Sequence, residues 1–272
     1  MFRKLMKYEM RAVSWLLPAC LLAMVLLYGA GWAAKAIGIR QVVTALAVAL
    51  ILVGCASVVV ALVTVVTRFY KGMFGAEGYL TQTLPVGKGS LIMSKAAVAY
   101  MLILLSLVMV FLSVFGGLQL LELLDPLSEL NALLGGWGVS FLVFSGILLL
   151  VQLAMNISEL YCAMTLANLR LCQSNGILFS VLFYFGLQMV VGMLEVVALL
   201  VLPLGLRFGT EGVSFVFEGM LGSLLEIGGQ TNDPALLGQM TIGLGSLVLD
   251  AAAAVVLLIV TRWLMTRKIS IK

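Results

Sequence analysis

The stretch of sequence that decides the fold is V-V-T-A-L-A-V-A-L-I-L-V-G-C-A-S-V-V-V-A-L-V-T-V-V-T, residues 42–67. It contains no charged side chain and consists mainly of Val, Ala and Leu. A helix needs about 20 consecutive apolar residues to cross the hydrocarbon core of a bilayer. This stretch is therefore long enough to form one membrane-spanning helix.

The same character extends over most of the chain. Of its 272 residues, 63% are hydrophobic and only 10% are charged, whereas soluble domains carry roughly 25% charged residues. This composition excludes a water-soluble fold. The apolar stretches are continuous and do not alternate with period two, so they indicate helices and not the strands of a transmembrane barrel.

We therefore predict an all-α polytopic membrane protein with six transmembrane helices in a single domain, residues 1–272. The predicted spans are Trp15–Ala36, Val42–Thr67, Ala96–Leu121, Leu133–Glu159, Gly176–Leu204 and Met240–Leu264. Each is long enough to cross a bilayer, the last only if the membrane-spanning helix accommodates Asp250.

The basic residues predict the orientation. With six spans both termini lie on one side of the membrane, and that side receives 13 of the 16 Lys and Arg residues. The other side holds only Lys35, Arg40 and Arg207, together with most of the acidic loop residues. Since cytoplasmic loops are enriched in Lys and Arg, we predict that both termini and the loop 68–95 are cytoplasmic. The protein is expected in the cell membrane as a multi-pass protein, in a bacterial plasma membrane.

Two segments outside the spans have helical patterns. Residues 1–14 alternate basic and apolar side chains at helical spacing, which favours an amphipathic helix in the membrane interface over a disordered basic tail. The longest predicted external loop, residues 207–239, contains V-S-F-V-F-E-G-M-L-G-S-L-L-E-I, residues 213–227. Its apolar bulk with sparse Glu predicts a short amphipathic or re-entrant helix.

The chain lacks the residues and motifs of most catalytic classes. It has no histidine, which removes Ser–His and Cys–His nucleophilic catalysis and most zinc sites. It contains no G-x-x-x-x-G-K-[ST] phosphate loop, so it cannot hydrolyse ATP in the P-loop manner by itself. We expect no catalytic residue, no metal and no cofactor bound by this chain, and no nucleic-acid partner.

Two acidic residues, Glu195 and Asp250, fall inside the fifth and sixth predicted spans. An ionisable group there costs at least about 2.5–3.5 kcal/mol by insertion scales, so it usually faces a bundle interior or an aqueous cavity. Two interpretations stay open. The acids form a proton or cation site or part of a substrate path, or they are structural residues that hydrogen-bond to Gln152, Gln188 or a helix carbonyl.

The loop between the second and third spans reads R-F-Y-K-G-M-F-G-A-E-G-Y-L-T-Q-T-L-P-V-G-K-G-S-L-I-M-S-K, residues 68–95. Four apolar residues at its start follow one helical face, namely Phe69, Tyr70, Met73 and Phe74. We therefore expect the second helix to continue beyond the membrane. The pairs Tyr79–Leu80 and Thr83–Leu84 add a short apolar stripe that ends at Pro85. The residues alone fit either a docking helix for another protein or a loop packed on its own bundle.

The run E-G-Y-L-T-Q-T-L-P-V-G-K-G-S-L-I-M-S-K, residues 77–95, resembles the cytoplasmic loop of six-span permease subunits of type 2 ATP-binding-cassette exporters. The matching positions are Glu77, Gly78, Leu80, Leu84, Pro85, Val86, Lys88 and Lys95. Gly87 departs from the pattern, because a Ser commonly precedes the basic residue there. The six spans, the interfacial N-terminal helix and the long last external loop also resemble that family.

The resemblance implies that this loop contains a coupling helix that docks on a separate ATPase subunit, which binds ATP and Mg. The implied coupling residues are Tyr70, Phe74, Glu77, Gly78, Tyr79, Leu80, Leu84 and Pro85. It further implies a permease that forms a homodimer or a heterodimer with a relative and exports an amphiphile such as a drug, lipid or peptide. The alternative is an ion-coupled secondary transporter or channel that uses Glu195 and Asp250.

Overall fold

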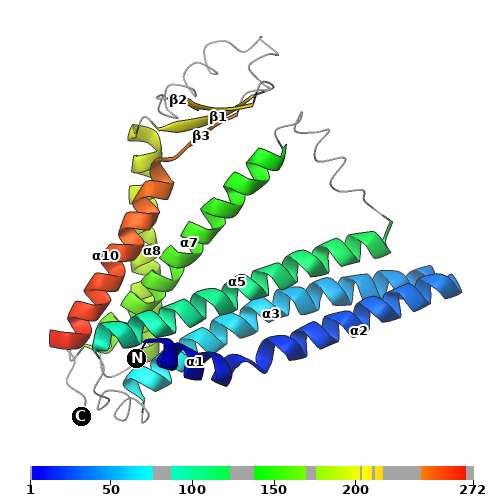
Figure 1. Ribbon diagram of the computed structural model, residues 1–272, viewed down its shortest axis with the longest axis horizontal. Coiled ribbons are helices and arrows are strands. Elements are labelled where there is room, and N and C mark those ends of the chain that lie inside the picture. Colours follow the sequence, from blue (N-terminus) through cyan, green and yellow to red (C-terminus); the bar gives the residue numbers. More distant parts are fainter. Residues whose placement is uncertain are drawn as a thin grey trace. The chain divides into compact units, whose positions relative to one another are not determined.

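The computed structural model describes residues 2–75, 87–122, 138–169, 176–202, 204–209, 212–216 and 240–267. These residues form seven α-helices and three short strands (Figure 1). Six of the helices are long and apolar enough to cross a membrane. They are α2 (Leu16–Ile37), α3 (Arg40–Phe74), α5 (Lys88–Leu120), α7 (Gly138–Ala167), α8 (Gly176–Val201) and α10 (Gly245–Arg267). The prediction of a helical protein with six candidate membrane spans is confirmed.

Several helices run further than the uncharged stretches that predicted them. Helix α3 continues past Thr67 to Phe74, as the apolar face of residues 69–74 predicted, which adds about 10 Å at 1.5 Å per residue. Helix α5 begins at Lys88, ahead of the predicted start at Ala96. Helix α7 continues past Glu159 to Ala167. A charge was a poor marker for the end of α7, because Glu159 is buried inside the protein and does not lie at a surface.

The three strands form a small antiparallel sheet in the order β2-β1-β3. Strand β1 (Gly205–Gly209) pairs with β2 (Gly212–Val216) and with β3 (Met240–Gly243). Two predictions were wrong here. Met240–Gly243 was expected to begin the last span, and Val213–Val216 was expected to belong to a helix. Both segments carry β-branched residues, as strands do, and each pairs with β1 by backbone hydrogen bonds; residues 217–239 lie outside the described residues.

The N-terminal segment is helical, as predicted, and forms α1 (Phe2–Val13). Its Leu5, Met6, Glu9 and Val13 are less exposed than the residues between them, and the helix packs against α5. Arg3, Lys4 and Lys7 are exposed on the other side, as is Tyr8, which is 72% exposed. This division into two faces is typical of a helix that lies on a surface. Its position in a membrane interface stays a prediction.

The contacts divide the chain into two compact units. The first contains α1, α2, α3 and α5, and its helices pack mainly as α3 with α5 and α2 with α3. The second contains α7, α8 and α10 with the three strands. In it, α7 packs against both α8 and α10, around the buried side chains of Met155, Val191 and Ala254.

Helices α3 and α5 pack closely because small residues face each other along their contact. The buried stripe of α3 includes Ala47, Gly54, Ser57 and Ala61. On α5, a Cβ atom built on Gly117 would lie 3.4 Å from the carbonyl oxygen of Ala47. The buried serines in this contact satisfy their hydroxyl groups within their own helices; that of Ser113, for example, donates to the Val110 carbonyl at 2.8 Å. Small residues that let backbones approach closely are the usual basis of helix association in membranes.

The tightest point of this contact is Gly54. A Cβ atom at this position would lie 1.9 Å from the Ser113 hydroxyl oxygen and 2.6 Å from its Cβ atom. Overpacking of this kind costs roughly 1–3 kcal/mol. We therefore expect Gly54→Ala to lower the thermal unfolding midpoint of the purified protein in detergent, and the double variant Gly54→Ala/Ser113→Gly to recover most of the loss.

The matched control is Gly29→Ala in α2, because a Cβ atom at Gly29 has no neighbour within 4 Å. This variant should unfold at or above the temperature of the unmodified protein, since Ala favours helices over Gly. Equal unfolding midpoints for Gly54→Ala and Gly29→Ala would show that the close approach of Gly54 and Ser113 does not affect the stability of the protein.

Candidate functional site

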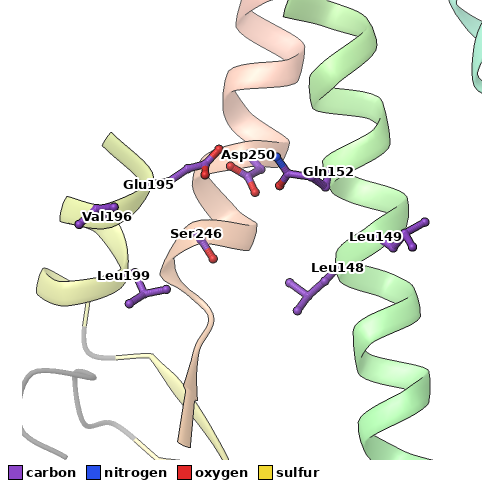
Figure 2. A pocket seen from close by; sticks show the side chains of 8 residues that line it. All are labelled: Leu148, Leu149, Gln152, Glu195, Val196, Leu199, Ser246 and Asp250. Carbon is purple, nitrogen blue, oxygen red and sulfur yellow. The ribbon is translucent and has the colours of Figure 1, made fainter. Parts of the chain in front are cut away.

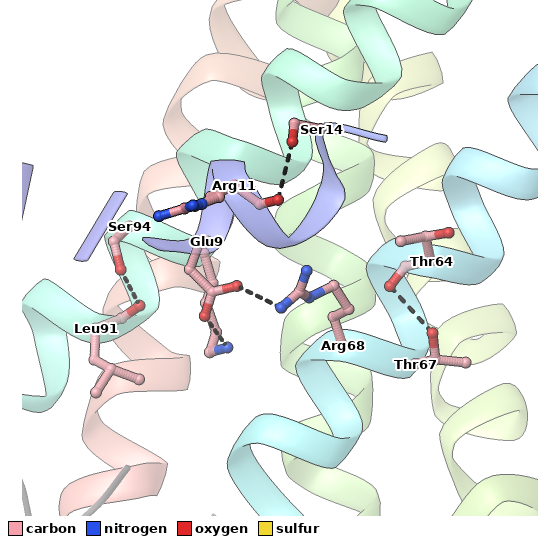
Figure 3. Close-up of polar contacts among 9 residues, drawn as sticks. Glu9, Arg11, Ser14, Thr64, Thr67, Arg68, Leu91 and Ser94 are labelled. Carbon is pink, nitrogen blue, oxygen red and sulfur yellow. Dashed lines mark hydrogen bonds and ion pairs between the residues drawn. The ribbon is translucent and has the colours of Figure 1, made fainter. Parts of the chain in front are cut away.

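The first unit contains a partly buried ion pair that attaches α1 to the bundle. The Lys95 ammonium group donates a hydrogen bond to Glu9 Oε1 at 2.5 Å, and its side chain is only 8% exposed. The other carboxylate oxygen of Glu9 lies 3.7 Å from a guanidinium nitrogen of Arg68 (Figure 3). Glu9 belongs to α1, Arg68 to α3 and Lys95 to α5. We call these three residues the Glu9 clamp.

Gly72 of α3 makes room for the clamp. A Cβ atom built on Gly72 would lie 2.8 Å from Lys95 Nζ, so a side chain there would displace the ammonium group. Hydrogen bonds between charged groups are shorter and stronger than neutral ones, and breaking a buried ion pair costs more than the pair contributes when intact. The close approach of Gly72 and Lys95 therefore serves to seat Lys95 against Glu9.

Sequence reasoning placed Lys95 at the cytoplasmic start of a span but did not single out Glu9. One signal was present. Glu9 is the only acidic residue before Glu77, and it stands among Arg3, Lys4, Lys7 and Arg11. Its position relative to Leu5 and Val13, at i−4 and i+4, also placed it on the face that packs against α5.

Two of the predicted coupling residues are in the described part of the chain. Tyr70 and Phe74 lie in the last turn of α3, with ring centroids 6.0 Å apart, and both are partly exposed. Their neighbours Phe69 and Met73 are buried in the first unit. The apolar face predicted for residues 69–74 is thus divided between packing and the surface. The other predicted coupling residues, Glu77, Gly78, Tyr79, Leu80, Leu84 and Pro85, lie outside the described residues.

The second unit brings three of the predicted intramembrane polar residues together. Gln152 of α7, Glu195 of α8 and Asp250 of α10 converge on one side of a cavity of about 510 Å³ (Figure 2). The remaining lining residues are Leu148, Leu149, Val196, Leu199 and Ser246. We call this space the acidic cavity. No basic side chain is among its lining residues, so two acids face a largely apolar wall.

Asp250 is the most confined group of the acidic cavity. The residue is 4% exposed, and its Oδ1 atom has no hydrogen-bond partner among the described residues. Glu195 and Asp250 line the same cavity from α8 and α10, together with Gln152 from α7.

Two further polar side chains, Glu159 on α7 and Gln188 on α8, lie on the same helix faces as residues that line the acidic cavity. Glu159 lies seven residues beyond Gln152 on α7, and Gln188 lies seven residues before Glu195 on α8. Seven residues are about two helical turns, so each pair shares a helix face. One side-chain oxygen of Glu159 and one of Gln188 are buried without a partner in the described residues. Glu159 is 1% exposed, and sequence reasoning missed its interior position because it was assigned to a span end.

A second cavity, of about 860 Å³, lies in the first unit between α1, α2 and α5. Its lining residues include Leu21, Val25, Met101 and Leu105, with Arg11 and Ser14 at the end nearest α1. No acidic side chain lines it. The two cavities therefore differ in the charge of their lining residues, and of these two the acidic cavity suits a positively charged group.

An ion pair joins the ends of α2 and α5 in the first unit, with the exposed Glu122 just beyond the predicted span. Lys35 of α2 lies 3.0 Å from the carboxylate of Glu122, just after α5. A hydrogen bond from Lys35 and its positive charge lower the pKa of the Glu122 carboxyl. Because Glu122 is exposed and far in sequence from both the Glu9 clamp and the acidic cavity, it serves below as a control position.

Comparisons with protein-family models, with curated proteins and with solved structures give no match to this chain. The fold and the two sites define its class as a helical protein with six candidate membrane spans. The resemblance to exporter permeases rests on residues 77–95 and on the order of the predicted segments, and an assignment to that family is a proposal.

If the Glu9 clamp holds α1 on the bundle, loss of its ion pairs should loosen this helix. Glu9→Ala removes the carboxylate that pairs with Lys95 and Arg68, while Ala keeps the helix propensity of α1 high. Hydrogen bonds to charged groups contribute about 1.5–3 kcal/mol, so we expect backbone amides of residues 2–13 to exchange hydrogen about tenfold faster or more. The measurement is hydrogen–deuterium exchange with mass spectrometry on the purified protein.

Glu122→Ala is the control, because it removes a carboxylate paired with Lys35 at the other end of the unit. It should leave exchange in residues 2–13 unchanged. Unchanged exchange in the Glu9→Ala variant would mean that apolar packing alone holds α1.

Proposed function

We propose that this chain is the membrane-spanning permease subunit of an ATP-binding-cassette exporter. It moves an amphiphilic substrate, such as a drug, lipid or peptide, outward with ATP hydrolysed by a separate subunit. The observation that carries the proposal is the position of the Glu9 clamp. It joins α1 to α3 and α5, the two helices that flank residues 76–86.

The position of the Glu9 clamp is suited to transmitting a force that acts on residues 76–86. Arg68 lies six residues before the end of α3 at Phe74, and Lys95 lies eight residues after Gly87, where the described chain resumes. Both helices extend by about two turns beyond the spans that hydropathy predicted. A push on residues 76–86 would therefore reach the spans through two stiff helices that Glu9 holds together with α1.

The proposed docking surface combines the predicted coupling residues. Tyr70 and Phe74 offer partly exposed rings at the end of α3. Tyr79, Leu80 and Leu84 would fill a groove on the ATPase, and Glu77 would hold the segment by charge-assisted hydrogen bonds. Aromatic anchors in a well-packed centre are typical of binding hot spots. The ATPase would bind ATP and Mg, and two copies of the permease, or this chain and a relative, would complete the transporter.

The docking surface can be tested by co-purification. The tagged chain, isolated from its native membranes, is expected to bring with it an ATP-binding-cassette ATPase that mass spectrometry identifies and whose ATP hydrolysis vanadate inhibits. The double variant Tyr79→Asp/Leu84→Asp should lose most of this ATPase, because two carboxylates in an apolar contact leave unpaired buried charges.

Phe215→Asp is the matched control. Phe215 is an aromatic residue of β2, 78% exposed and on the predicted external side. This variant should keep the ATPase, and all three proteins should elute alike in size-exclusion chromatography. The proposal fails if the unmodified chain brings no such ATPase, or if the double variant retains it in normal amount.

The acidic cavity favours one second candidate, an ion-coupled secondary transporter. Two carboxyl groups and an amide in an apolar bundle are typical of proton or cation pathways in membranes. This candidate predicts uptake or export driven by an ion gradient without an ATPase. In vesicles that hold the purified chain alone, a proton gradient should drive transport, and Glu195→Gln should abolish it. A chain that transports only with an ATPase present excludes this candidate.

A further inference from the structure

We infer that the acidic cavity is a binding site for an organic cation, an amphiphile whose single ammonium group sits between Glu195 and Asp250. The apolar part of this ligand would lie along Leu148, Val196 and Leu199. The inference deepens the proposed function, because it names the class of substrate, and it rests on that function only for the step of transport. Binding itself does not require an ATPase.

The first argument is the unpartnered carboxylate oxygen. Asp250 is buried to more than nine-tenths and lines the cavity, yet its Oδ1 has no hydrogen-bond partner in the described residues. A buried polar atom without a partner costs about 1–3 kcal/mol, and more when it is charged. Figure 2 shows the side chains of Glu195 and Gln152 directed toward Asp250 from two other helices. A donor placed among them would satisfy this oxygen.

The second argument is charge. Two carboxyl groups line the cavity, and no basic side chain lines it to neutralise them. An ammonium group supplies one positive charge and up to three N–H donors. Two carboxyl groups and the Gln152 side-chain oxygen are suitable acceptors for those donors. The acidic lining and the hydrogen-bonding capacity of the site therefore suit an alkylammonium group.

The third argument concerns size and lining, which favour an organic ligand over a metal ion. In the part of the chain that the structure describes, no group of three or more His, Cys, Asp or Glu residues could hold a metal ion. The volume of about 510 Å³ is within the range of about 300–1,000 Å³ that is usual for small-molecule sites. Such sites are mainly apolar with a few polar groups that orient the ligand. The acidic cavity has this composition.

The test uses a fluorescent amine and its neutral twin. Monodansylcadaverine carries an apolar ring system and a primary amine that is protonated at neutral pH, as the Lys side chain is. Its N-acetyl derivative has the same ring system and no charge. Each is titrated into the purified full-length chain in phosphatidylcholine nanodiscs, with empty nanodiscs subtracted. The fluorescence increase then reports saturable binding.

We expect the amine to bind about tenfold more tightly than its acetylated form or better, because only the amine brings a positive charge that pairs with the carboxylates. In the double variant Glu195→Gln/Asp250→Asn this preference should fall to about one. Glu122→Gln, which removes an exposed carboxylate elsewhere, should keep it. Equal binding of the two compounds by the unmodified chain overturns the inference, and so does a preference that survives in a normally eluting double variant.

The comparison of the two compounds on the unmodified chain decides the matter even if the double variant does not fold. The outcome is also independent of the proposed function. A preference for the amine in a chain that recruits no ATPase keeps the cation site and rejects the exporter assignment. Recruitment of an ATPase without any preference for the amine keeps the exporter assignment and rejects the cation site.

Discussion

A charged side chain that leaves water must find a partner in the protein, and the sites of both units depend on this constraint. In the first unit Lys95, buried at the predicted cytoplasmic edge of α5, pairs with Glu9 of α1 beside Gly72 of α3. The short basic helix α1 is thereby attached to the bundle by an ion pair as well as by its apolar face. In the second unit the same constraint turns Glu159, Glu195 and Asp250 inward from three different helices. Glu195 and Asp250 line the acidic cavity, in which Asp250 Oδ1 has no hydrogen-bond partner among the described residues.

The two units also differ in how closely their helices pack. In the first, Gly54 and Gly117 let α3 and α5 approach until backbone and small side chains touch, and the serines bond within their own helices. This leaves little space between α3 and α5 at these positions. In the second, Met155, Val191 and Ala254 form a small core between α7, α8 and α10, and the acidic cavity is left beside it. The proposed exporter would use the Glu9 clamp of the first unit for coupling and the acidic cavity of the second unit for a cationic cargo.

Much of the fold could be predicted from the sequence, and so could part of the sites. Six spans, a helical N-terminus and the continuation of α3 to Phe74 all follow from hydropathy and helical periodicity. Gln152, Glu195 and Asp250 were recognisable as polar residues in apolar surroundings. Their proximity could not be predicted, because Gln152 and Asp250 lie nearly a hundred residues apart. The sequence of a single helix does not show which helices pack against it. Glu159 was misread for a related reason, since a charge ends a span only if it faces the surface.

The sequence by itself determined the class of this protein: a helical chain with six segments that can cross a membrane. Hydrophobicity summed over about 20 neighbouring residues is a local property, so it needs no knowledge of the fold. Only the tertiary structure decided that Glu9 pairs with Lys95, 86 residues away. It also decided that Asp250 and Glu195 share a cavity and that Met240–Gly243 is a strand and not the start of a helix. These outcomes depend on which helix faces and which backbone edges meet, and on the desolvation of charged groups there, which makes partners necessary.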